Sequence, residues 1–230
     1  MIRPLEMRQL LRGAVIALLW AIPGTASAGV IRGTVHVPVR EDATVASMNA
    51  YPGRAGSMPG TRGVIRGLAS DAVVYVERIP ARAESALAAS ARATPRLAQK
   101  DQSFVPRVVA VAVGTSVDFP NQDPIYHNVF SLSPARRFDL GKYPRGSSRQ
   151  VVFSKPGLVN VFCDIHSDMA AFVLVLPHHG FARPSPTGAF ALPDLPAGSY
   201  VLRAWHPDLG EKTMTVEIPR SGDVTANVSF

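Results

Sequence analysis

The residues with the clearest chemistry lie in one short segment, where the single cysteine, Cys163, is followed by His166 and Met169 in the spacing C-x2-H-x2-M. A thiolate, an imidazole and a thioether together suit a copper ion that changes between two oxidation states. The segment directly follows the apolar run 158–162, which predicts that a strand holds it. It supplies one half of a copper site, because a second imidazole is still missing.

His127 is a suitable source of the second imidazole. It lies in a polar loop after the apolar run 116–119 and well before the cysteine. In a β-sandwich, loops that are distant in sequence converge at one end and bring their side chains onto one ion. The sequence therefore predicts that His127 and the cysteine segment meet at one end of a sandwich.

Cys163 and its neighbours also have other interpretations. Cys163 could be an inert buried thiol, and a lone cysteine excludes an internal disulfide. A structural zinc site prefers a fourth thiolate, imidazole or carboxylate to Met169. A binuclear copper centre needs a second cysteine, and no protease signature surrounds Cys163. We therefore expect one copper ion and no enzymatic activity.

The elements that must position these residues are predominantly β. Short apolar runs rich in Val and Phe alternate with Gly, Pro and Asn, a pattern typical of sandwiches and barrels. The predicted strands are residues 30–37, 72–76, 108–113, 116–119, 150–153, 158–162, 171–176, 199–205, 212–218 and 224–230. Residues 41–70 lack strand periodicity and predict a mobile loop. Residues 80–100 could form some helix but have no coherent apolar face, so they predict a linker.

Residues 104–176 resemble the cupredoxin family, and the short ligand loop is most similar to that of amicyanin. The resemblance implies a Greek-key β-sandwich with one type 1 copper ion. It further implies that His127 and His166 are the imidazole ligands, Cys163 the thiolate and Met169 the axial thioether. Asn128, directly after the first histidine, would brace the ligand loop near the sulfur.

The segments on either side resemble the carboxypeptidase regulatory-like, transthyretin-related β-sandwich, on the strength of residues 29–35, 73–76 and 188–205. Neither flank alone has enough strands for a stable core, so we expect 29–79 and 178–230 to pack as one small sandwich. The adjacent His178 and His179 predict an exposed junction. The expected organisation is a signal peptide (1–28), N-terminal strands (29–79), a linker (80–100), the copper domain (101–177) and the remaining strands (178–230).

The N-terminus has the features of an export signal. Three arginines precede the apolar run 14–22, and the small residues 26–28 fit a cleavage site. The apolar run is far shorter than the ~20 residues that a membrane-spanning helix needs. We expect cleavage after residue 28, a mature chain without a membrane span, and a periplasmic location.

The formal net charge is +7, but the basic residues are not interleaved with aromatic stacking groups, which argues against nucleic-acid binding. Bases crowd residues 136–155, where Asp139 is the only acid. They are Arg136, Arg137, Lys142, Arg145, Arg149 and Lys155. Such a cluster would steer an acidic redox partner protein, although a merely solvated surface explains it equally well.

The function that we expect is that of an exported one-electron carrier. Two alternatives stay open: a copper-binding protein that stores or senses the metal, and a structural sandwich that binds other molecules and has an incidental thiol. Reversible one-electron chemistry would favour the electron carrier. Exchangeable Cu(I) without reversible redox chemistry would favour the storage or sensing protein, and absence of metal would favour the structural sandwich.

Overall fold

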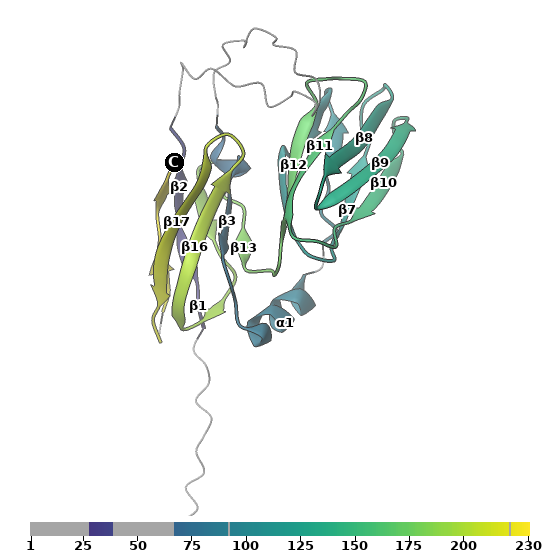
Figure 1. Cartoon of the computed structure of the whole chain (residues 1–230). Helices are drawn as coiled ribbons and strands as arrows, with labels where there is room; N and C mark the ends of the chain where they lie inside the picture. The colour runs from purple at the N-terminus through teal and green to yellow at the C-terminus, as the bar shows by residue number, and fades with distance from the viewer. Residues whose placement is uncertain (1–27, 39–66, 92, 221) are drawn as a thin grey trace, which may run out of the picture.

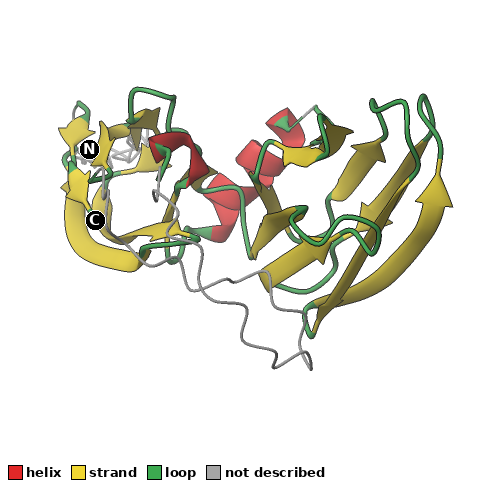
Figure 2. Cartoon of the chain, turned by 90° about the horizontal axis from the view of Figure 1, so that it is seen from above, coloured by secondary structure: helices red, strands yellow, loops and turns green. Residues whose placement is uncertain are grey.

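A computed structural model describes residues 28–38, 67–91, 93–220 and 222–230 of the protein. These residues form two β-sandwiches that lie side by side, with helix α1 (Ala81–Ser90) near one end of both (Figure 1). The view from above shows two separate bodies of strands with the helix between them (Figure 2). The predicted all-β fold class is confirmed. Within the described ranges, no helix is long and apolar enough to cross a membrane.

The sandwich that contains the cysteine has one five-stranded sheet in the order β6-β12-β11-β8-β9. These strands are β6 (Val108–Ala112), β12 (Ala170–Leu176), β11 (Gly157–Phe162), β8 (His127–Ser133) and β9 (Arg136–Tyr143). The facing layer is the antiparallel pair β7 (Ser116–Pro120) and β10 (Ser148–Val152), joined by the hairpin β4 (Ala98–Lys100) and β5 (Ser103–Val105). Bridges from Arg96 to Asp118 and from Gln99 to Asn121 attach the hairpin to this layer.

Strand β12 is buried on both faces. Ala171, Val173 and Val175 belong to the core between the two layers, which also contains Cys163 and Met169. The alternate residues of β12 face the second sandwich; they are Phe172, Leu174 and Leu176. Because side chains alternate along a strand, β12 contributes side chains to two cores. Its sequence is therefore a continuous apolar run.

The second sandwich combines strands from both ends of the chain. One sheet has the order β13-β3-β16-β17, and the other has β14-β2-β18 with β19 paired to β2. The N-terminal members are β2 (Ile31–His36) and β3 (Val73–Val76). The others are β13 (Phe181–Ala182), β14 (Ala189–Ala191), β16 (Gly198–His206), β17 (Gly210–Ile218), β18 (Val224–Thr225) and β19 (Val228–Ser229). A short pair, β1 (Ala28–Gly29) with β15 (Leu195–Pro196), adds to it. Every one of these sheets therefore joins strands that are distant in sequence.

The segment 80–100, predicted to be a linker, differs from that expectation. Residues 81–90 form α1, which has no fully buried residue. The Glu84 carboxylate accepts the His179 backbone N–H at 2.8 Å and lies 2.7 Å from its Nδ1. Leu97 is fully buried in the cysteine-containing core, and β4 pairs with β5. Tertiary contacts thus order a segment whose own pattern is weak.

Three further expectations concern His178, the loop 41–70 and the signal peptide. His178 is 7% exposed and therefore not part of an exposed junction, because its ring packs beside Gly180 and its Nε2 lies 3.2 Å from the Glu77 carbonyl. The predicted loop 41–70 lies outside the described residues except at 67–70, where the turn η1 (Ala69–Asp71) begins. The predicted signal peptide lies outside them except for Ala28.

The two sandwiches contact each other through an apolar cluster and one ion-pair network. Phe172 of β12 meets the Trp205 ring edge-on at 6.0 Å, and Arg107 lies 5.3 Å above the Phe172 ring. The Arg107 guanidinium donates two hydrogen bonds to Asp208, at 2.6 and 2.7 Å, and lies 3.5 Å from Asp71. Such a two-pronged contact fixes orientation as well as distance.

Candidate metal centre

The cysteine loop is closed by the backbone on either side of it. Strand β11 ends at Phe162 and β12 begins at Ala170, and these two residues are paired. Beyond them, the Cys163 N–H donates to the Met169 carbonyl at 3.3 Å, and the Met169 N–H donates to the His166 carbonyl at 3.1 Å. The short loop therefore has a defined shape that projects the side chains of Cys163, His166 and Met169 at one end of the sandwich.

His127 reaches the same end from strand β8. It is the first residue of β8 and pairs with Tyr143 of β9. The register of β8 and β9 shifts between Asn128 and Phe130, directly after the histidine. Irregularities of this kind re-aim side chains next to functional sites, and here the side chain of His127 is fully buried.

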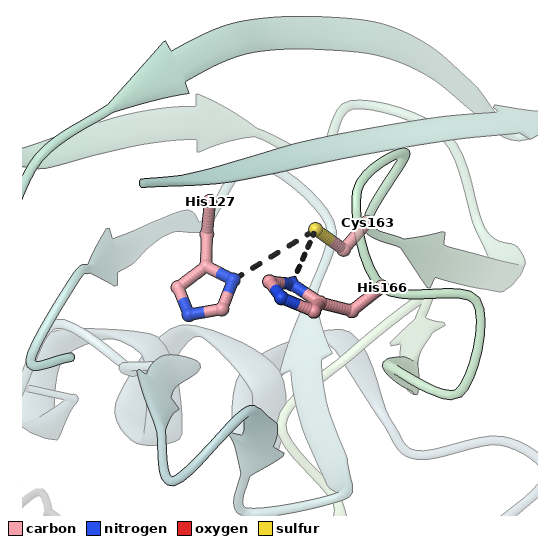
Figure 3. Close-up of side chains that lie close together, drawn as sticks. All are labelled: His127, Cys163 and His166. Atoms are coloured by element: carbon pink, nitrogen blue, oxygen red, sulfur yellow. Dashed lines mark hydrogen bonds between the residues drawn. The ribbon is translucent and has the colours of Figure 1, made fainter. Parts of the chain in front are cut away.

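The three side chains converge on one point (Figure 3). The Cys163 Sγ atom lies 3.9 Å from His127 Nδ1 and 3.9 Å from His166 Nδ1. The possible ligand atoms of the three residues all lie within 4.8 Å of one another. Cys163 is fully buried, like His127, whereas His166 is only partly buried. The sulfur is thus shielded from solvent, whereas the His166 imidazole is partly exposed to it.

The nitrogen–sulfur distances fit a shared metal ion. With metal–nitrogen bonds of about 2.0 Å and metal–sulfur bonds of about 2.3 Å, the two ligand atoms are about 3.5 Å apart at a tetrahedral angle. At a trigonal angle of about 120–130° the same separation is about 3.7–3.9 Å. The observed 3.9 Å for both histidines matches the wider arrangement. A thiolate and two imidazoles in trigonal array are the donors that copper takes in blue sites.

The two remaining predicted residues lie beside this cluster. Met169 is 1% exposed and belongs to the same core as Cys163. Asn128 is 2% exposed, and its side-chain amide donates to the Asp139 carboxylate at 2.7 Å. Since Asp139 also accepts the Gly141 N–H, this contact braces β8 against β9 directly behind the first histidine.

Asp123 is a residue of the site that sequence reasoning missed. Its carboxylate lies 2.8 Å from His127 Nε2 and is 5% exposed. Burial alone would raise its pKa, but hydrogen bonds from the Gln102 N–H, His127 and the Asp101 N–H outweigh burial and hold the pKa below its usual value. The spacing D-x3-H was a visible signal, but nothing in the sequence placed the 101–102 turn beside it.

The surface around the loop 163–169 is mixed. The exposed apolar side chains there are Ile125, Tyr126 and Ile165. Asp164 and Asp168 flank His166 and are exposed, so the loop itself presents two carboxylates. Next to the 121–124 loop lies an open cavity of about 590 Å³ lined by Lys100, Asp101, Asn121, Gln122, Asp123, Pro124, Arg145 and Gly146.

The predicted basic cluster is divided by the fold. Arg136 and Arg137 pair with Ser133 and Leu132, at the far end of β9 from Tyr143. At about 3.4 Å per residue, the six steps from Arg137 to Tyr143 span about 20 Å, which exceeds the screening length of about 8 Å in physiological salt. The bases at the ligand end are Lys142, Arg145 and Arg149, which are exposed, as is Lys100. Arg136 and Arg137 therefore do not form one patch with Lys142, Arg145 and Arg149.

No protein-family model matches the sequence, and no curated protein is significantly similar to it. Similar solved structures include a Cu-containing nitrite reductase from Thermus scotoductus SA-01, with 25% identity over 37% of this chain and 23% of that one (TM-score 0.35). This chain therefore spans less than a quarter of that enzyme. A purple cupredoxin from Nitrosopumilus maritimus has 20% identity over 35% of this chain and 98% of that one (TM-score 0.32). An amicyanin variant in its Cu(I) form has 18% identity, with 46% and 98% covered (TM-score 0.34).

Proposed function

We propose that this chain is an exported, mononuclear type 1 copper protein of the cupredoxin class that carries single electrons and catalyses no reaction of its own. The observation that carries the proposal is the cluster of His127, Cys163 and His166, in which both Nδ1 atoms lie 3.9 Å from one buried sulfur. The periplasm is the proposed location, on the strength of the N-terminal signal pattern. The second sandwich is assigned a scaffolding role.

The chain's own residues would fix the geometry on which fast electron transfer depends. His127, Cys163 and His166 would hold the ion, with Met169 as the weak axial ligand. Copper bound there would supply the one-electron step between Cu(I) and Cu(II). Strands β11 and β12 hold the loop 163–169 at its two ends, and strand β8 holds His127. Burial protects the Cys163 thiolate from oxidation.

His166 is the residue through which an electron would enter or leave. It is the one member of the three-residue cluster that is not fully buried, and Ile165 beside it is 41% exposed. Ile165, Tyr126 and Ile125 form an exposed apolar surface next to the imidazole, on which a partner would dock.

Voltammetry of the copper-loaded protein tests the proposed carrier function. We expect a reversible one-electron wave that persists over many cycles, because the ligands are fixed by strands. Copper that binds as Cu(I) and exchanges readily, without a reversible wave, would instead show a storage or sensing protein. Failure to bind copper would leave only the structural interpretation.

The substitution Met169→Gln is expected to lower the reduction potential while copper stays bound. A glutamine oxygen is harder than a thioether and favours Cu(II) over Cu(I). Voltammetry and the visible spectrum of the variant measure the effect. Unchanged spectrum and unchanged potential would show that Met169 is not a ligand, while loss of copper would show that it is an essential one.

The redox partner that we propose is a protein with an acidic surface, which docks beside the ligand end. Lys142, Arg145 and Arg149 are exposed there, and Lys100 lies with Arg145 on the rim of the 590 Å³ cavity. Asp164 and Asp168 are exposed on the ligand loop and would repel an acidic partner there. The partner is thus expected to approach from the β9–β10 side.

The substitution Arg145→Glu tests this docking side with a small anionic reagent, hexacyanoferrate(III). We expect oxidation of the Cu(I) protein to slow about 3- to 10-fold at low salt, and the difference to shrink as salt screens the charges. Arg137→Glu makes the same change of charge on β9 about 20 Å from Tyr143 and is the matched control. Equal slowing by both variants, or none by either, would remove the argument for a local docking site.

A further inference from the structure

The Asp123 carboxylate connects a copper-ligand candidate to a neighbouring turn. Its Oδ2 lies 2.8 Å from His127 Nε2 and accepts the Gln102 backbone N–H at 2.9 Å. Its Oδ1 accepts the Asp101 N–H at 2.6 Å. The Asp123 N–H is itself held by the Asn121 side-chain oxygen at 2.9 Å, so the carboxylate is fixed from both sides.

The turn that Asp123 holds is strained. Asp101 and Gln102 link β4 to β5 as a two-residue hairpin loop, and both have φ of 54°. Hairpin loops with positive φ at both positions normally contain Asn and Gly, because side chains such as that of Gln disfavour this region at a cost of about 1–2 kcal/mol per residue. Both N–H groups of the turn point to the Asp123 carboxylate, which compensates for that cost. The turn in return anchors the carboxylate.

The hairpin is itself fastened to the ligand-bearing loop. The Gln122 N–H donates to the Gln99 carbonyl at 2.9 Å, and the Gln99 side chain donates to the buried Tyr143 hydroxyl at 2.5 Å. Tyr143 is the residue that pairs with His127. Asp123 therefore cannot swing away from the imidazole without breaking several contacts of the β4–β5 hairpin.

We propose that Asp123 is a positioning residue that holds His127 in one tautomer and places a fixed negative charge behind that ligand. Both oxygens of the Asp123 carboxylate already accept backbone N–H groups, so the carboxylate acts as an acceptor and the Nε2 atom that faces it carries the proton. The lone pair is then on Nδ1, the atom that faces the Cys163 sulfur at 3.9 Å. The adjacent negative charge stabilises the more positive state of a metal ion and so lowers its reduction potential. The copper affinity and the potential rest on the proposed function, whereas the tautomer in the metal-free protein does not.

The test compares Asp123→Asn with the wild-type chain in two measurements. Nitrogen-15 NMR of the metal-free protein is expected to show the Nε2–H tautomer of His127 in the wild type and a mixture with Nδ1–H in the variant. In the copper-loaded protein, the variant is expected to lose copper affinity about 10- to 100-fold and to have a higher reduction potential.

Asp164→Asn is the matched control, since it removes the same charge from an exposed position between Cys163 and His166. It is expected to leave the His127 tautomer unchanged and to shift the potential less than Asp123→Asn does. If Asp123→Asn does not fold, Gln102→Gly is added to it, because glycine adopts positive φ without strain and keeps its N–H. An unchanged His127 tautomer in the folded variant, or a potential shift no larger than that of Asp164→Asn, would overturn the proposal. Because NMR uses metal-free protein, a failure of the copper assignment would not hide this outcome.

Discussion

Replacing Cys163 with serine is expected to abolish the intense blue absorption of the copper-loaded protein. The band arises from charge transfer between a thiolate sulfur and Cu(II), and a serine oxygen cannot supply it. Serine is close to cysteine in size, so the fully buried position should still accommodate it, although the hydroxyl is more polar. We expect weakened copper binding and a nearly colourless spectrum from a chain that still folds.

Ser167→Ala is the matched control for that substitution. Ser167 is an exposed residue of the same loop, between His166 and Asp168. Its loss should leave the absorption unchanged, and circular dichroism should show that both variants are folded. An intense blue centre that persists in Cys163→Ser would contradict the assignment of Cys163 as the thiolate ligand, because the chain has no other cysteine.

Replacing Phe172 with alanine is expected to destabilise the folded chain by about 3–5 kcal/mol. The side chain is 5% exposed, meets Trp205 edge-on and lies beneath the Arg107 guanidinium, so its loss leaves a cavity between the two sandwiches. Chemical denaturation of the metal-free protein measures the loss. The blue spectrum of the loaded variant should not change, because Phe172 points away from the core that holds Cys163.

Leu158→Ala on the adjacent strand β11 provides the comparison for Phe172. Leu158 is 37% exposed, and its replacement is expected to cost less than about 1 kcal/mol. If Phe172→Ala were no more destabilising than Leu158→Ala, the contact between the sandwiches would contribute little to stability. The second sandwich would then be a tethered neighbour and not a support for strand β12.

The cysteine segment was predictable because its chemistry is local. Cys163, His166 and Met169 lie within seven residues of sequence, and the apolar runs before and after them predict a strand on each side. His127 needed one further step, namely that sandwich loops converge at one end. The structure brings His127 and His166 to the same sulfur.

The features that escaped prediction depend on contacts between distant segments. Nothing near Asp123 in the sequence indicates that its carboxylate would meet the N–H groups of Asp101 and Gln102. Helix α1 has no apolar face of its own. The contact of its residue Glu84 with His179, 95 residues away in sequence, holds it in place. The basic run 136–155 looked like one cluster because a sequence does not show that the extended strand β9 separates Arg136 and Arg137 from Lys142 and Arg145.

The measurement that tests the copper assignment most directly is the visible spectrum of the wild-type protein during titration with Cu(II). We expect an intense blue band that rises to one equivalent of copper and then stays constant, since the chain has a single cysteine and one cluster of His127, Cys163 and His166 among the described residues. Zinc or an idle thiol cannot produce such a band. A protein that binds one equivalent of Cu(II) with only the pale colour of nitrogen and oxygen ligands, or that binds none, would contradict the assignment.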